Sequence, residues 1–213
     1  MEATGKYSGV IVAGGAGRRM GGCWKGGLIL GGRSFVSRVA DGLEDFQEKC
    51  LSVKDKAQLP EEERRELLTR GFKILEDRPG DEGPLAGLWQ GLACTGGEGI
   101  LAVAADTPLF DRDLARQLCA LAQGQRDWDA CLCRLGGRDY PLCAVYKKSC
   151  LPVIGEQLGK KEFRVTAALE RLRTGFLELP EGDLRLFNVN RPKDYERLGA
   201  LGAAGTEWNG ARH

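Results

Sequence analysis

Residues 7–21 read Tyr-Ser-Gly-Val-Ile-Val-Ala-Gly-Gly-Ala-Gly-Arg-Arg-Met-Gly. A short apolar run, residues 7–13, leads directly into a glycine-rich loop that contains Arg18 and Arg19. A continuous apolar run of this length is typical of a strand that is buried on both faces of a sheet. The stretch therefore predicts a buried strand followed by a loop whose backbone lies close to something negatively charged.

Apolar runs of the same kind recur along the chain at residues 71–75, 99–105 and 129–135. Between them, apolar residues recur with helical spacing. These sets are Val36, Val39, Ala40 and Leu43; Leu85, Leu88, Trp89 and Leu92; and Leu114, Leu118 and Leu121, preceded by Asp111 as a candidate N-cap. The alternation predicts an α/β fold of three layers, with helices on both faces of a mainly parallel sheet.

The composition excludes several classes of protein. The net charge is +1, from 31 basic and 30 acidic residues, which argues against a nucleic-acid-binding protein. No apolar stretch has the length of a membrane span, and residues 1–9 lack the apolar core of a signal sequence, so we expect a cytoplasmic protein. The 213 residues suffice for one sizeable domain.

The cysteines and the single histidine also narrow the chemistry. None of the eight cysteines belongs to a C-x-x-C pair, and His213 is the only histidine, so neither a zinc site nor histidine catalysis is expected. Most cysteines lie in apolar runs, which favours buried thiols in a reducing compartment. Cys131 and Cys133 would share one face of a strand.

Ligands of open parallel sheets bind at the carboxyl ends of the strands. Asp77 follows the run at 71–75 and Asp106 follows the run at 99–105, so both acids should lie at the same edge as the glycine loop. Mg²⁺ prefers one or two carboxylates together with phosphate oxygens. Lys25 could supply a point charge for a triphosphate, and Arg18 or Arg19 a planar donor.

Each of these features also has a purely structural explanation. The loop is neither a Walker A sequence nor a dinucleotide fingerprint, and Asp106 could cap a helix. Gly83-Pro84 is explained by a turn and a helix start, although Gly83 would also let a nucleotide approach the backbone. Asn188 and Asn190 lie on one side of an extended segment, where they could bind a polar ligand or simply form turns before a helix at Pro192.

Taken in order, these motifs resemble the molybdenum cofactor guanylyltransferase (MobA) family. The family motifs are Ala-Gly-Gly-x-x-x-Arg-Met-Gly, Lys-Gly, Gly-Pro-Leu-Ala-Gly, Asp-x-Pro, Pro-Leu-x-Ala-x-Tyr and Asn-x-Asn. The matching residues are 13–21, 25–26, 83–87, 106–108, 141–146 and 188–190, within a resemblance that covers residues 7–199. The resemblance implies a Rossmann-like nucleotidyltransferase domain over residues 1–199, with a nucleotide-binding half at 7–110 and an acceptor-binding half at 111–199. Residues 200–213 would be a flexible tail.

The resemblance also implies a reaction, in which the terminal phosphate of molybdopterin attacks the α-phosphate of GTP and pyrophosphate leaves. Asp106 would bind Mg²⁺, and Lys25, Arg19 and Asp106 would be catalytic. The nucleotide would contact Val12, Ala13, Gly14, Gly15, Gly17, Arg18, Lys25, Asp77, Gly83, Pro84 and Asp106. Asn188 and Asn190 would face the acceptor. A GTP-binding accessory protein and apo-molybdoenzymes are partners implied only by the family.

Two positions depart from the family pattern. Trp24 stands where the family usually has aspartate before the lysine, and Arg191 where it usually has threonine. Trp24 could stack on a base or a pterin, or could simply pack. A cytidylyltransferase of the same fold stays open as an alternative, since the double glycine is thin evidence for guanine. A degenerate relative that binds GTP or finished cofactor without transferring GMP also stays open.

Overall fold

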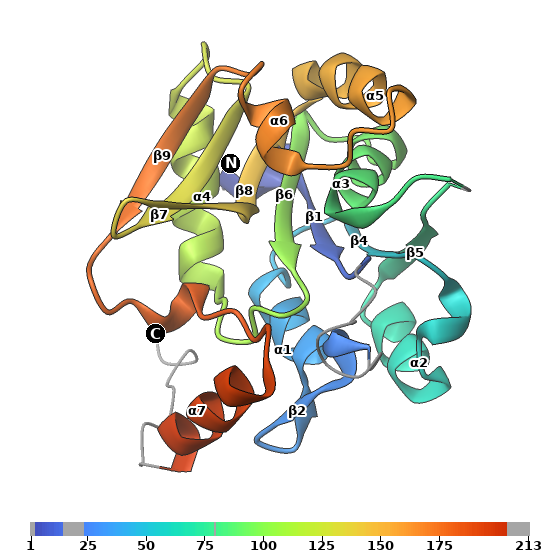
Figure 1. Ribbon diagram of the computed structural model, residues 1–213, viewed down its shortest axis with the longest axis vertical. Helices are drawn as coiled ribbons and strands as arrows, with labels where there is room; N and C mark the ends of the chain where they lie inside the picture. Colours follow the sequence, from blue (N-terminus) through green and yellow to red (C-terminus); the bar gives the residue numbers. More distant parts are fainter. Residues whose placement is uncertain (1–2, 15–23, 79, 204–213) are drawn as a thin grey trace.

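The computed structural model describes residues 3–14, 24–78 and 80–203. Within these residues, seven strands form one sheet in the order β5-β4-β1-β6-β8-β7-β9 (Figure 1). The strands are β1 (Tyr7–Val12), β4 (Lys49–Val53), β5 (Phe72–Glu76), β6 (Gly99–Ala104), β7 (Ala130–Leu135), β8 (Arg138–Lys147) and β9 (Thr174–Leu179). Neighbouring strands are parallel except at β8, which is antiparallel to β6 and β7. The predicted mainly parallel sheet is confirmed, and β8 is an antiparallel strand that no pattern had indicated.

Helices cover both faces of the sheet, as the alternating pattern predicts. One face packs against α1 (Phe35–Gly42), α2 (Glu61–Thr69) and α4 (Arg112–Gly124). The other packs against α3 (Gly83–Cys94), α5 (Leu151–Gly159) and α6 (Val165–Leu169). The side chains of β1 alternate between these two cores, with Ile11 in the first and Val10 and Val12 in the second. The three-layer architecture is therefore confirmed.

The predicted helical stripes are the buried faces of these helices. Val36 and Val39 of α1, and Leu85 and Leu88 of α3, are fully buried. The predicted N-cap is also present, because Asp111 Oδ1 accepts a 2.8 Å hydrogen bond from the backbone N–H of Leu114 at the start of α4.

A smaller cluster lies beyond the carboxyl edge of the sheet. The hairpin of β2 (Ile29–Leu30) and β3 (Arg33–Ser34) lies beside α7 (Pro192–Ala203), whose predicted start at Pro192 is confirmed (Figure 1). Tyr195 Oη donates a 2.5 Å hydrogen bond to the carbonyl of Ile29. The buried residues of this cluster are Phe35, Leu109, Val189 and Leu198. Two segments far apart in the sequence are therefore held together next to the sheet edge.

Short 3₁₀ turns complete the described elements. They are η1 (Ala3–Lys6), η3 (Lys25–Gly27), η4 (Lys56–Gln58), η5 (Lys148–Cys150) and η6 (Leu184–Leu186). Across residues 3–14, 24–78 and 80–203, no helix combines the length and apolar character needed to cross a membrane. The cysteines in these ranges are free thiols, buried except for Cys94, and Cys131 and Cys133 belong to the same core, as predicted.

Candidate active site

The carboxyl ends of β1, β5 and β6 bring three predicted site segments to one edge of the sheet. The backbone ladder continues one residue past the strands. The Ala13 N–H donates to the Ser52 carbonyl (2.8 Å), and the Asp77 N–H donates to the Val53 carbonyl (2.9 Å). On the other side of β1, the Ala105 N–H donates to the Val12 carbonyl (3.1 Å). The strand ends thus hold the start of the glycine loop, Asp77 and Asp106 at a common rim.

Lys25 joins two other predicted site residues at this rim. Its Nζ lies 2.8 Å from Asp106 Oδ2 and 2.8 Å from Asn190 Oδ1. The Lys25 and Asp106 side chains are 23% and 17% exposed, so the ion pair is only partly screened by water. Residues from η3, from the end of β6 and from the segment before α7 therefore meet at a single ammonium group.

Asn188 lies next to this group but has a different partner. Thr107 Oγ1 donates a 2.8 Å hydrogen bond to Asn188 Oδ1. Between the two asparagines, the Val189 N–H donates to the Asp106 carbonyl at 3.0 Å. The backbone of the segment before α7 is thus hydrogen-bonded to the backbone at the end of β6. Asn188 contacts the Thr107 side chain, and Asn190 contacts the Lys25 side chain.

Asp77 is held by a serine that no motif had singled out. Ser52, which is fully buried on β4, donates a 3.0 Å hydrogen bond from Oγ to Asp77 Oδ1. Burial raises the pKa of Asp77 to about 6, although the hydrogen bond from Ser52 opposes this change. The only sequence signal for Ser52 is a polar residue inside the apolar run 50–53.

Two glycines of the predicted motifs make room for this serine–aspartate pair. A Cβ at Gly14 would lie 2.9 Å from Asp77 Oδ2, and a Cβ at Gly87 would lie 2.9 Å from Ser52 Oγ. Gly83, at the start of α3, has a φ of +72°, which glycine adopts without strain. Glycine at these three positions is therefore explained by close approach or by backbone conformation.

A cleft of about 430 Å³ adjoins the Thr107–Asn188 pair. Its walls are mostly apolar or aromatic, with a few polar side chains. The lining residues are Pro84, Thr107, Arg138, Asp139, Tyr140, Pro141, Leu142, Cys143, Phe163, Arg164, Val165, Thr166 and Asn188. A cleft with apolar walls and a few polar groups is typical of a small-molecule site.

An irregularity in β8 builds one wall of this cleft. Leu132 of β7 pairs with Ala144 of β8, but the next residue of β7, Cys133, pairs with Tyr140. The β8 residues between these two pairs, 141–143, have no opposite residue on β7, and all three line the cleft. Tyr146 Oη donates a 2.8 Å hydrogen bond to the Pro141 carbonyl and so braces the bulge. This contact gives a structural reason for the Pro-Leu-x-Ala-x-Tyr motif.

The charged groups of the cleft are mostly paired. Arg164 forms two side-chain hydrogen bonds to the carboxylate of Glu162, each 2.9 Å long, and Asp139 is paired with Arg134. Arg138 is different, because its guanidinium lies 5.2 Å from the ring centroid of Tyr140 and makes no ion pair within the described part of the chain. The cleft therefore carries one positive charge that no neighbouring carboxylate compensates, which favours an anionic ligand.

Comparison with known proteins places this geometry in a family. A family model described as the MobA-like NTP transferase domain matches residues 9–174. The chain belongs to the MobA-like NTP transferase family. It is 32% identical over 198 residues to a molybdenum cofactor guanylyltransferase of Cereibacter sphaeroides, covering 91% of this chain and 95% of that one. A probable molybdenum cofactor guanylyltransferase of Bacillus velezensis is 30% identical, covering 89% and 92%. The predicted family and its nucleotidyltransferase class are confirmed.

Solved structures of this fold are similar in architecture. Molybdopterin-guanine dinucleotide biosynthesis protein A from Archaeoglobus fulgidus superposes with a TM-score of 0.76 at 21% identity, covering 92% of this chain and 99% of that one. A 2-C-methyl-D-erythritol 4-phosphate cytidylyltransferase from Thermus thermophilus superposes with a TM-score of 0.68 at 17% identity. At these identities the superpositions establish the fold of this MobA-like transferase.

The side chain of Trp24 packs against its own neighbours in this MobA-like transferase. A Cβ at Gly26 would lie 2.6 Å from the Trp24 ring, and one at Gly27 would lie 3.2 Å from it. The half-buried ring also packs against the core between the sheet and α1. Of the two interpretations that the sequence left open, the structure favours packing. The two glycines after Lys25 are thereby explained as space for the indole.

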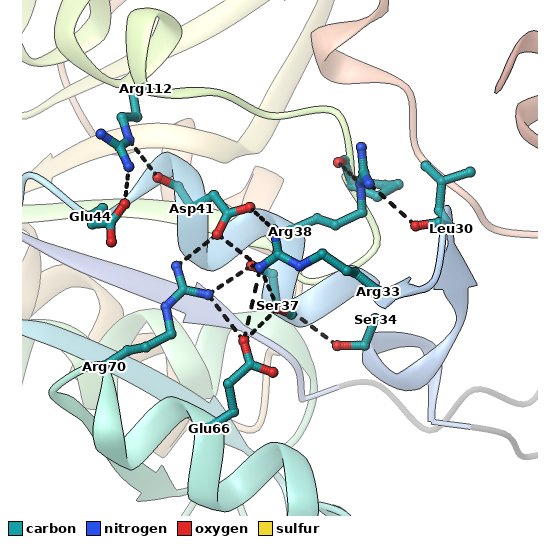
Figure 2. Close-up of polar contacts among 11 residues, drawn as sticks. Leu30, Arg33, Ser34, Ser37, Arg38, Asp41, Glu44, Glu66, Arg70 and Arg112 are labelled. Atoms are coloured by element: carbon teal, nitrogen blue, oxygen red, sulfur yellow. Dashed lines mark hydrogen bonds and ion pairs between the residues drawn. The ribbon is translucent and has the colours of Figure 1, made fainter. Parts of the chain in front are cut away.

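A polar network fixes the hairpin that follows Lys25 in this transferase (Figure 2). Asp41 of α1 accepts from Arg33 at 2.6 Å and from Arg70 at 2.9 Å. Arg38 donates to the carbonyls of Leu30 (3.2 Å) and Pro108 (3.3 Å). Arg38 therefore links the hairpin after Lys25 to the loop after Asp106 and holds the two segments next to each other.

Some predicted residues do not take part in side-chain contacts at this site. Val12 is buried in the core, so only its backbone is available at the rim. Pro84 lies in the wall of the cleft. Gly15, Gly17, Arg18 and Arg19 lie outside the described residues, and their predicted roles stay predictions.

Proposed function

We propose that this chain transfers GMP from GTP to the terminal phosphate of molybdopterin carrying molybdenum, with release of pyrophosphate. The product would be the guanine dinucleotide form of the cofactor. The observation that carries the proposal is the convergence of Lys25, Asp106 and Asn190 beside a cleft that contains Asn188. The names of the curated relatives support the same reaction.

The nucleotide would lie along the rim formed by Ala13, Gly14 and Asp77. Gly14 lets the backbone of the loop approach Asp77 closely, because a Cβ at this position would lie 2.9 Å from Asp77 Oδ2. Ser52 fixes the other carboxylate oxygen and therefore the orientation of the group. The positive end of α3, which begins at Gly83, would add a favourable field for phosphates.

The residues around Asp106 fit a magnesium ion. Across the described ranges, no three His, Cys, Asp or Glu side chains gather as a metal site, so a cation here would depend on substrate oxygens as well. Mg²⁺ commonly binds in that way, through one or two protein oxygens plus phosphates. The Lys25 ammonium, 2.8 Å from Asp106 Oδ2, supports this role, because the carboxylate already has a positive group beside it. Bound there, Mg²⁺ would neutralise charge on the phosphate oxygens.

The protein groups would act by positioning and by charge. Lys25 would hold the triphosphate and stabilise the leaving pyrophosphate, and Arg19 keeps its predicted part in the same role. Holding the two substrates in line supplies a large part of the rate enhancement in such reactions. No general base is needed, because the attacking phosphate is already ionised at neutral pH.

The acceptor would occupy the cleft between α6 and the bulge of β8. Phe163, Tyr140 and Pro141 supply flat or apolar surfaces for a ring system, and Asn188 supplies amide contacts near the rim. The uncompensated charge of Arg138 favours an anionic molecule. This arrangement suits a phosphorylated pterin better than a neutral acceptor.

A transfer assay with defined products tests the proposal. The purified protein is incubated with molybdenum-loaded molybdopterin, Mg²⁺ and either GTP or CTP, and pyrophosphate and the dinucleotide product are quantified. We expect equal amounts of pyrophosphate and guanine dinucleotide product, with much less product from CTP. Faster transfer from CTP would move the chain to the cytidylyltransferases, and nucleotide binding without pyrophosphate release would indicate a binding protein.

A further inference from the structure

Two buried thiols meet where the bulge of β8 lies against β7. The Cys143 S–H donates a hydrogen bond to Cys133 Sγ, with the two sulfur atoms 3.6 Å apart. Both side chains are buried, and both cysteines are free thiols. Within the part of the chain that the structure describes, this is the one hydrogen bond between two thiols. The proposed transfer of GMP uses neither sulfur.

The pairing of the strands explains why these two cysteines matter for the cleft. Cys133 of β7 is paired with Tyr140, whereas Cys143 is one of the three residues of β8 that have no opposite residue on β7. The contact between the two sulfurs therefore spans the bulge. Because residues 141–143 also line the cleft, a change in this contact would be transmitted to the wall of the cleft.

The two side chains are placed for a covalent bond. A disulfide needs two cysteines on adjacent backbones whose side chains point toward each other. The S–H of Cys143 is already directed at the sulfur of Cys133. Once one sulfur carries a leaving group, the other attacks from within the same molecule, and this proximity favours the intramolecular bond over a lasting mixed disulfide.

We propose that Cys133 and Cys143 form a redox modification site, which a small organic disulfide entering the cleft converts into an intramolecular disulfide bond. The Cys143 sulfur attacks one sulfur of the reagent, so that a mixed disulfide forms and one small thiol leaves. The Cys133 sulfur then attacks the Cys143 sulfur, so that the Cys133–Cys143 bond forms and the second small thiol leaves. The two protons of the cysteines end on the two released thiols. The reagent is reduced by the two electrons that the cysteines lose.

The surroundings of the pair make this reaction slow and restrict it to small reagents. The hydrogen bond to Cys133 and burial raise the pKa of the Cys143 thiol, so little thiolate is present at neutral pH. Cys143 is one of the residues that line the cleft, whereas Cys133 is fully buried in the core. The cleft is therefore the route of access, and Cys143 is the sulfur that reacts first.

Oxidation of the folded protein with 2-hydroxyethyl disulfide, followed by mass spectrometry of tryptic peptides, tests the site. Trypsin cleaves after Arg134 and Arg138, so Cys133 and Cys143 fall in different peptides. The wild type should yield these two peptides joined, with the loss of two hydrogen atoms, and dithiothreitol should separate them. Cys143→Ala should give no joined peptides. Separate peptides from the oxidised wild type would overturn the proposal.

Cys131→Ala is the matched control, because Cys131 lies in the same tryptic peptide and the same core as Cys133. This variant should form the joined peptides at the rate of the wild type, and their loss would show that Cys131, not Cys133, is the partner of Cys143. Thermal unfolding of every variant confirms that it is folded. No substrate is present, so these outcomes do not depend on whether GMP transfer is observed.

The bond should also change the cleft, and this consequence rests on the proposed function. A covalent bond brings the two sulfurs closer than their contact as thiols, so it draws the bulge toward β7. The oxidised wild type should therefore show a several-fold higher KM for the acceptor and an unchanged KM for GTP, and dithiothreitol should reverse the change. An unchanged KM for the acceptor in fully cross-linked protein would overturn the link between this bond and the cleft.

Discussion

Ser52 Oγ donates a 3.0 Å hydrogen bond to Asp77 Oδ1, across the carboxyl ends of the neighbouring strands β4 and β5. The pair is almost fully buried, with Ser52 inaccessible and Asp77 8% exposed. Gly14 and Gly87 lie against it at distances that leave no room for a Cβ. A titratable carboxyl is therefore locked in place at the rim where the nucleotide is expected.

The stability of the protein should depend on pH through Asp77. Burial raises its pKa from 3.8 to about 6, so the folded state favours the protonated form. The contribution of the protonated Asp77 carboxyl to the free energy of unfolding is fully present below about pH 4 and is lost as the pH rises through about 6. The loss amounts to about 3 kcal/mol. The free energy of unfolding of Asp77→Asn should therefore increase relative to that of the wild type as the pH rises from 5 to 8. Urea unfolding at each pH measures this difference.

Ser52→Ala provides the matched control for this effect. The hydrogen bond from Ser52 lowers the pKa of Asp77, so its removal should move the pH-dependent step upward. If the wild type and Asp77→Asn showed parallel stability curves over this range, Asp77 would not titrate near pH 6 in the folded state.

Lys25→Ala should slow GMP transfer by about 10²–10³-fold in kcat, which is the usual effect of removing one group that stabilises transition-state charge. Because Lys25 also contacts Asp106 and Asn190, the KM for GTP should change as well. Steady-state kinetics with Lys193→Ala as the control measures both values. Turnover near that of the wild type in Lys25→Ala would remove the lysine from the mechanism.

Gly87→Ala should destabilise the fold, because the new Cβ would lie 2.9 Å from both Ser52 Oγ and Val12 Cγ1. Overpacking of this kind costs about 1–3 kcal/mol, which should lower the Tm by several degrees. Gly199→Ala on α7 is the matched control, because the added Cβ would have no other atom within 4 Å and alanine favours helices. Thermal unfolding measures both variants. Equal decreases in Tm for Gly87→Ala and Gly199→Ala would contradict the close packing of α3 on β4.

Tyr146→Phe should weaken binding of the acceptor while leaving binding of GTP unchanged. The substitution removes the hydroxyl that braces the Pro141 carbonyl and so loosens one wall of the cleft. A lost hydrogen bond of this kind corresponds to about a 2–10-fold increase in the KM for the acceptor. Tyr7→Phe, a buried tyrosine of β1 outside the cleft, is the control. An equal increase in the KM for GTP would show that Tyr146 acts on the whole fold.

Much of the central architecture was predictable from the sequence for a simple physical reason. The apolar runs that became β1 and β6 are buried on both faces, and the stripes of α1, α3 and α4 match the helical period. Since parallel strands end at one edge, the sequence alone was enough to predict Asp77 and Asp106 at the same edge as the end of β1. Short local patterns thus carried most of this information.

The remaining features depend on contacts between distant residues, which local patterns do not encode. The partner of Lys25 at residue 190 lies 165 positions away, and the bulge at residues 141–143 appears only when β8 is paired with β7. Ser52 is one polar residue in an apolar strand, with no motif to mark it. Trp24 fitted two interpretations until its ring was found against Gly26 and Gly27.

A thermal-shift comparison of GTP, CTP and ATP, each with and without Mg²⁺, tests the central claim most directly when run on the wild type and on Asp106→Ala. A nucleotide at about 100 times its Kd should add about 2.7 kcal/mol, or about 5–11 °C in Tm for a domain of this size. We expect this rise for the wild type only with GTP and Mg²⁺ together, and a much smaller one for Asp106→Ala. An undiminished rise in Asp106→Ala, or a rise with CTP alone, would contradict the account.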